Sequence, residues 1–176
     1  PKDVRTSLGA GAVSGKTQVD PKIALKMLSD QEQQFEQKVV KVADNVFTAV
    51  GFHGANTSMI VGTDGVIIVD TLKGPTSAAN AFKAVRAYSA KPVKAIIYTH
   101  SHGDHTGGAS AFVGDKTPEI YSAENFGYAT GVNEALNSIA FKRGIRQFGR
   151  KLPPEEMTNR GLAPAGTIDH DRGKGY

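Results

Sequence analysis

One short stretch constrains this chain more than any other, the segment IIYTHSHGDHTGG at residues 96–108. An apolar run ends there and is followed at once by three histidines and an aspartate within six positions, although the whole chain has only five histidines. Two adjacent glycines close the segment. Loops rarely carry so many ligand-type side chains directly after a buried strand. The pattern therefore predicts a metal site built on a rigid strand end.

The spacing of these side chains predicts two metal ions. His100 and His102 are two positions apart, so in an extended segment they project to the same side and can share one ion. Asp104 and His105 follow where the chain turns into a helix, and this pair can point toward a second ion. Imidazole nitrogens and carboxylate oxygens are good zinc ligands. Gly103 allows the backbone to turn between the two pairs.

The apolar pattern on both sides of the motif predicts a mixed α/β protein. The tetrapeptide GTDG at 62–65 is a strong turn signal between two apolar runs. The predicted strands are 39–42, 46–50, 58–61, 66–70, 93–99 and 118–121, and the predicted helices are 21–38, 77–88 and most of 123–148. Several strands come first and then alternate with helices, which is typical of a mixed sheet.

Composition excludes several classes of protein. The 176-residue chain carries a net charge of +4 from scattered lysines and arginines, whereas nucleic-acid-binding proteins gather such charges on one face. No apolar run is long enough to span a bilayer. Cysteine is absent, which excludes disulfides and thiolate ligands. The stretch GAVSGKT at 11–17 looks like a phosphate-binding loop, but Ala10 stands where its first glycine is required, so a flexible arm is the better interpretation.

The motif H-x-H-x-D-H after an apolar strand resembles that of the metallo-β-lactamase superfamily, and Asn56 to Asp70 resemble the paired strands that precede it there. This resemblance implies an α/β fold, the αββα sandwich, with its N-terminal half in this chain. It also implies two Zn2+ ions, a metal-bound hydroxide as the nucleophile and a role for Asp104 in positioning the metal-bound water. In that family the aspartate matching Asp70 supports the metal-binding loop without binding metal itself.

Within the superfamily, the surrounding sequence resembles the alkyl sulfatases, which hydrolyse sulfate esters such as dodecyl sulfate. The resemblance rests on residues 49–72 and on the pair Lys142-Arg143 before Leu152-Pro153. It implies a zinc-dependent sulfuric ester hydrolase. Two alternatives stay open. One is another hydrolase of the superfamily, acting on thioesters, lactones or nucleic acids. The other is a non-catalytic fragment that needs a partner chain.

The resemblance also implies that this chain is incomplete. Alkyl sulfatases are much longer, and their remaining ligands lie well beyond the first motif. His53, Glu124 and His170 are interpreted as ordinary structural residues. We expect residues 1–38 to form an N-terminal arm and helix, and residues 39–176 to form the N-terminal part of the catalytic domain.

The expected partners follow from the same resemblance. They are an alkyl sulfate substrate, the remainder of the enzyme as a second polypeptide or a missing C-terminal part, and a second copy in a homodimer of the complete enzyme. No nucleic acid and no membrane span are expected. A periplasmic or secreted location is expected, with the cytoplasm left open.

Overall fold

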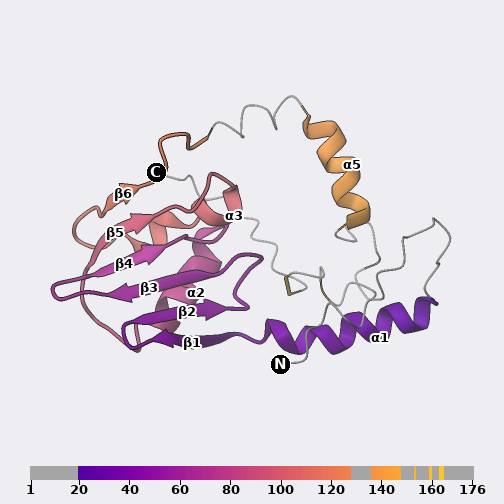
Figure 1. The fold of residues 1–176 in the computed structure, drawn as a ribbon, viewed down its shortest axis with the longest axis horizontal. Helices are drawn as coiled ribbons and strands as arrows, with labels where there is room; N and C mark the ends of the chain where they lie inside the picture. Colours follow the sequence, from indigo (N-terminus) through magenta and orange to yellow (C-terminus); the bar gives the residue numbers. More distant parts are fainter. Residues whose placement is uncertain (1–19, 128–135, 148–152, 154–158, 160–162, 165–176) are drawn as a thin grey trace.

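The computed structural model describes residues 20–127, 136–147, 153, 159 and 163–164 (Figure 1). In chain order the elements are α1 (Pro21–Glu32), η2 (Gln33–Phe35), β1 (Lys38–Ala43), β2 (Val46–Val50), β3 (Thr57–Val61), β4 (Val66–Val69), α2 (Pro75–Val85), β5 (Val93–Ile97), α3 (Gly103–Thr106), η3 (Ala109–Phe112), β6 (Glu119–Tyr121) and α5 (Asn137–Gln147). None of the helices in these described ranges is long and apolar enough to cross a membrane.

The strands form one mixed sheet whose spatial order is the same as the chain order, β1 to β6. The pairs β1–β2, β2–β3 and β3–β4 are antiparallel, while β4–β5 and β5–β6 are parallel. The GTDG turn joins β3 to β4 with a hydrogen bond from Gly62 N to Gly65 O of 2.8 Å. The parallel pair β4–β5 requires a crossover, and α2 supplies it.

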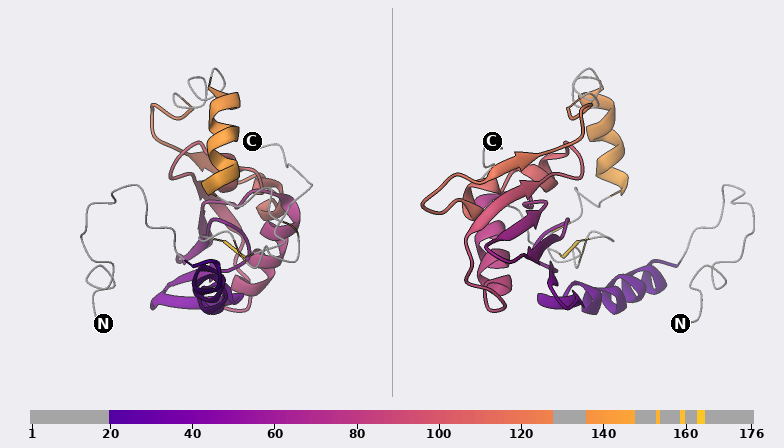
Figure 2. Two further views of the ribbon diagram at one scale, coloured as in Figure 1. Left: turned by 90° about the vertical axis from the view of Figure 1, so that its right-hand side faces the viewer. Right: turned by 60° about the vertical axis from the view of Figure 1, so that its left-hand side comes forward.

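The hydrophobic core lies between the sheet and α2, which covers one face of it (Figures 1 and 2). Small residues on the buried side of α2, Ala78 and Ala81, allow the helix to lie close to the strands. On the sheet side, buried residues alternate with less buried ones because successive strand residues face opposite sides. The core side chains from the strands include Phe47, Met59, Val66, Ile68 and Ile96.

The opposite face of the sheet is apolar over part of β3, β4 and β5, beside the hydrogen-bonded hydroxyls of Thr48 and Ser58. Register places Ile60 beside Ile67 and Val69 beside Ile97 on that face. These four side chains are only half-buried, whereas their neighbours on the α2 side are fully buried. One face of the sheet is thus packed by α2, and the other presents an apolar surface.

The predicted strands are all found, with small differences at their ends, and the predicted helices differ more. The first helix ends at Glu32 and continues as a short 3-10 turn, so it does not reach residue 38. Residues 123–127 form a turn rather than the start of a helix, because Gly127 has φ +86°, which a helix does not contain. The expected flexible arm at 11–17 lies outside the described residues.

Candidate metal centre

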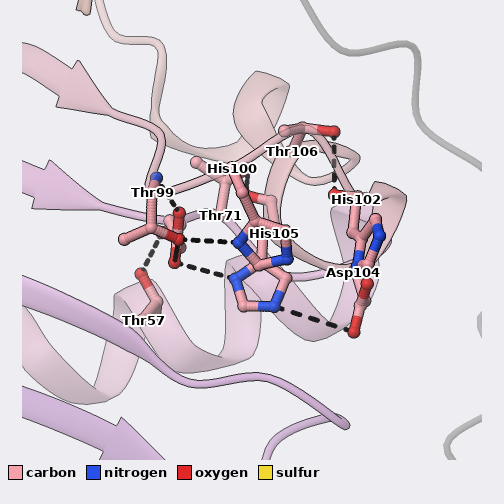
Figure 3. A network of polar contacts seen from close by, with 9 residues as sticks. Thr57, Thr71, Thr99, His100, His102, Asp104, His105 and Thr106 are labelled. Carbon is pink, nitrogen blue, oxygen red and sulfur yellow. Dashed lines mark hydrogen bonds and ion pairs between the residues drawn. The ribbon is translucent and has the colours of Figure 1, made fainter. Parts of the chain in front are cut away.

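The histidine-rich loop leaves β5 at the edge of the sheet where β4 also ends. Parallel neighbouring strands bring their carboxyl ends together, and side chains there can form a common site. His102 is the N-cap of the single-turn helix α3, with extended backbone angles (φ −67°, ψ 141°), and Asp104 and His105 lie inside that turn. Asp70 follows β4 directly. Figure 3 shows the histidines of the loop beside threonines from neighbouring segments.

Asp70 is the main acceptor of hydrogen bonds in this site. Its Oδ1 accepts from the backbone N–H of Thr99 at 2.9 Å, and its Oδ2 accepts from Thr99 Oγ1 at 2.7 Å. The same Oδ2 lies 2.8 Å from His105 Nδ1. The residue is 6% exposed, so these partners replace water around the carboxylate. The role predicted for Asp70, supporting the loop without binding metal, is consistent with these contacts and stays a prediction.

The backbone of Asp70 is itself held in an uncommon conformation. Its φ of +58° lies in the left-handed region, which aspartate tolerates better than most residues. The buried Thr57 donates its hydroxyl to Asp70 O at 2.6 Å, and Asp70 N donates to Ile97 O at 2.9 Å. Leu72, two residues on, also has a positive φ of +62°. The two residues together redirect the chain after β4 toward the histidine-rich loop.

Hydrogen bonds join that redirected segment to the loop. Thr71 donates twice to His105 O, from its backbone N at 2.7 Å and from Oγ1 at 3.0 Å. Gly108 N donates to Leu72 O at 3.2 Å. A Cβ on Gly107 would lie 1.9 Å from Lys73 O. A Cβ on Gly108 would lie 2.1 Å from Thr71 O, so both glycines of the motif are needed for the close approach of the two backbone segments.

The three imidazole rings of the motif lie together. The ring centroids of His100 and His105 are 4.0 Å apart, and those of His100 and His102 are 4.6 Å apart. His105 Nε2 lies 3.8 Å from Asp104 Oδ2. His100 and His102 are exposed, whereas Asp104 and His105 are partly buried. All four predicted ligands are thus gathered at one edge of the sheet.

The side chains of the motif are of the type that binds a zinc-like ion, but too few of them are arranged around one point. Three imidazoles and a carboxylate are the side chains such an ion prefers. Among the residues that the structure describes, no group of three or more histidine, cysteine, aspartate or glutamate side chains is arranged to hold a metal ion. These four side chains therefore lie near one another without forming a complete metal site by themselves, and the ligand assignment of His100, His102, Asp104 and His105 stays a prediction.

The other residues weighed from the sequence lie elsewhere. His53 is buried (7% exposed) between β2 and β3, and Glu124 is exposed in the turn after β6. His170 lies outside the described residues. Sequence reasoning missed the threonines of this site, Thr57, Thr71 and Thr99, because a hydroxyl can contact any nearby carbonyl or carboxylate. Only the position of Thr99, between a strand end and a ligand histidine, offers a hint.

A comparison with protein-family models matches residues 50–171 to the metallo-beta-lactamase superfamily. This range covers most of the chain and includes Asp70 and the whole histidine motif. The chain belongs to the metallo-beta-lactamase superfamily. The predicted resemblance is confirmed, and so is the predicted α/β fold, of which this chain holds a part with a mixed six-stranded sheet.

Within the superfamily the chain is similar to alkyl sulfatases. It is 34% identical over 121 residues to an alkyl/aryl-sulfatase of Saccharomyces cerevisiae, which covers 65% of this chain and 19% of that protein. It is 40% identical over 79 residues to the alpha subunit of a 2,4-dinitroanisole O-demethylase of Nocardioides sp. (strain JS1661), which covers 44% of this chain and 22% of that subunit.

A solved structure shares the fold. It is the stereoselective inverting sec-alkylsulfatase of a Pseudomonas species, with a TM-score of 0.60 and 23% identity, over 80% of this chain and 26% of that one. The chain spans about a fifth of the length of the curated relatives it matches.

Proposed function

We propose that this chain carries part of the metal centre of a hydrolase that cleaves sulfate esters of alkyl chains. The observation that supports it most is the supported H-x-H-x-D-H loop, in a chain of this superfamily that is 34% identical to an alkyl/aryl-sulfatase over 121 residues. In this proposal His100 and His102 contribute to one zinc site, and Asp104 and His105 contribute to a second. A bound zinc ion would supply a water of lowered pKa and a positive charge facing the ester oxygens.

The chain's own residues would act by binding and orienting. Asp70 and Thr71 hold the loop through their hydrogen bonds with Thr99 and His105, and Asp104 is proposed to orient the attacking water. Each ion would need about three protein ligands, and the motif offers two for each. The remaining ligands are proposed to come from the rest of the enzyme, as a C-terminal part or a second polypeptide, with the complete enzyme a homodimer.

The apolar face of the sheet gives this proposed partner a place to pack. Ile60, Ile67, Val69 and Ile97 are half-buried there, and covering apolar surface contributes about 25 cal/mol per Å². We also propose a periplasmic or secreted location, which fractionation of the source cells would test.

A second candidate reaction is the cleavage of an aryl methyl ether. The relative with 40% identity over 79 residues is by name a 2,4-dinitroanisole O-demethylase subunit. Both reactions need a nucleophile generated at the same loop, so the site alone favours neither. The longer match to the alkyl/aryl-sulfatase places sulfate esters first.

The test uses the complete protein loaded with zinc. We expect release of sulfate from an alkyl sulfate, and little or no methanol from 2,4-dinitroanisole. His102→Ala and Asp104→Asn should each nearly abolish sulfate release while the circular dichroism spectrum is unchanged. Asp115→Asn is the matched control, because Asp115 is an exposed carboxylate in the loop before β6. Methanol release without sulfate release would transfer the proposal to the ether, and a fully active His102→Ala would remove the loop from the reaction.

A further inference from the structure

The hydroxyl of Thr99 lies between a carboxylate and a histidine. Thr99 Oγ1 is 2.7 Å from Asp70 Oδ2 and 3.0 Å from His100 Nδ1. A hydroxyl has one hydrogen to donate, and a carboxylate can only accept. The hydrogen of Thr99 is therefore directed to Asp70, which leaves its oxygen as an acceptor toward His100.

The direction of the Thr99 hydroxyl hydrogen determines the tautomer of His100. Because Thr99 Oγ1 has no second hydrogen, His100 Nδ1 must carry one and donate it. In a neutral imidazole the other nitrogen, Nε2, then has the free lone pair. The same reasoning applies to His105, whose Nδ1 lies 2.8 Å from Asp70 Oδ2 and must also be the donor.

One carboxylate thus reaches two histidines by different routes. His105 contacts Asp70 directly, whereas His100 contacts it through the Thr99 hydroxyl, and the network is drawn in Figure 3. Both rings are left with Nε2 as the ligating atom, and their centroids are 4.0 Å apart. Hydrogen bonds of this kind to ligand histidines orient the ring and raise the basicity of the ligating nitrogen.

We propose that Thr99 is a positioning residue that extends the hydrogen bonding of Asp70 to His100, so that a single aspartate selects the ligating nitrogen of both histidines. The proposal rests on the metal centre proposed above, but not on the identity of the substrate. It assigns a function to a side chain that is exposed and lies outside the hydrophobic core. Loss of its hydroxyl removes one hydrogen bond to the buried Asp70 carboxylate, so the circular dichroism spectrum and the urea midpoint of each variant are measured alongside.

The experiment compares Thr99→Val, which removes the hydroxyl at nearly constant shape, with Thr99→Ser, which keeps it. Thr117→Val is the matched control, because Thr117 is an exposed threonine just before β6. The complete protein, with 15N-labelled histidine and free of metal, is examined by long-range 1H–15N NMR at about pH 8, where an ordinary histidine is neutral. Zinc affinity is then measured by competition with a chromophoric chelator.

In the unchanged protein, Thr99→Ser and Thr117→Val, we expect His100 to carry its hydrogen on Nδ1. In Thr99→Val we expect a mixture of the two tautomers at His100, an unchanged His105, and zinc binding weaker by about 10- to 100-fold. An unchanged His100 tautomer in Thr99→Val would overturn the proposal, as would a Thr99→Ser protein as impaired as Thr99→Val. The tautomer is read without metal or substrate, so a protein inactive on sulfate esters that shows the expected shift would refute only the proposed function.

Discussion

Gly107 lies so close to a neighbouring backbone segment that a single added methyl group should disturb the fold. Gly107 has ordinary helical angles (φ −73°, ψ −19°) that alanine adopts freely. A Cβ there would lie 1.9 Å from Lys73 O and 2.8 Å from Lys73 C. Non-bonded contacts normally lie near 3.5 Å, so Gly107→Ala requires the Lys73 carbonyl to move by more than about 1 Å.

That movement is costly because the segment is held on both sides. Thr71 donates twice to His105 O, and Gly108 N donates to Leu72 O. Overpacking typically costs about 1–3 kcal/mol, and the loss of one of these hydrogen bonds adds about 1 kcal/mol. We therefore expect Gly107→Ala to lower the free energy of unfolding by about 2–4 kcal/mol.

Gly103→Ala is the matched control on the same helical turn. The turn at Gly103 does not require glycine as the sequence predicted, because its φ is not positive and a Cβ there would meet no atom within 4 Å. Alanine should therefore be neutral or stabilise by up to about 1 kcal/mol through its better helix propensity. Both variants of the complete protein are unfolded in urea, and hydrogen exchange of the Thr71 amide is followed by mass spectrometry. Gly107→Ala should lose protection at that amide. Equal urea midpoints and equal exchange for the two variants would refute the close packing on which the loop depends.

Three further predictions concern the site and the sheet. Asp70→Asn should weaken zinc binding by about 10- to 100-fold in a chelator competition, and an unchanged affinity would contradict the role of its carboxylate. Burial raises the pKa of the Tyr98 phenol above its ordinary 10.0, the nearby Thr71 hydroxyl opposes the rise, and the charge of Asp70 adds to it. The folded state therefore holds the phenol proton more tightly than the unfolded state does. The stabilising contribution of Tyr98 is complete below pH 10 and is lost as the pH rises through the folded pKa. Urea unfolding should show a fall in stability above pH 10 that is smaller in Tyr98→Phe. Residues 1–176 expressed alone should bind a hydrophobic dye through the apolar sheet face and bind zinc weakly, and a cooperative, monomeric two-zinc protein with full turnover would contradict this.

The sequence predicts the framework of the site better than its supporting contacts. Period-two apolar runs and the GTDG turn locate the strands, because those patterns depend on neighbours in the chain. The position of Asp70 at a strand end follows from the family motif. The contact between Thr99 and Asp70 joins residues 29 positions apart, and it depends on the path of the backbone after β4. No local pattern determines that path, since it requires positive φ values at both Asp70 and Leu72.

In the region after β6, the local sequence predicts the wrong secondary structure. Residues 123–127 were predicted to continue into a helix from their composition, but Gly127 takes a positive φ and Phe126 N donates to Ala123 O at 3.0 Å in a turn. A glycine near a helix boundary can extend or end the helix, and propensity alone does not decide between the two.

The identity of spatial and chain order in the sheet has a consequence for how this protein folds as it is synthesised. Each strand pairs with the one made just before it, so loop closure is short and each addition can occur as the chain leaves the ribosome. Asp70 at the end of β4 then lies beside three strands that are already paired, with the Thr57 hydroxyl donating to its carbonyl oxygen, before His100 is made. We expect ribosome-bound chains that expose residues up to Val85 to protect β2 and β3 from proteolysis already. The histidine-rich loop would then fold last, against strands β1 to β4 that are already paired and next to the carboxylate of Asp70.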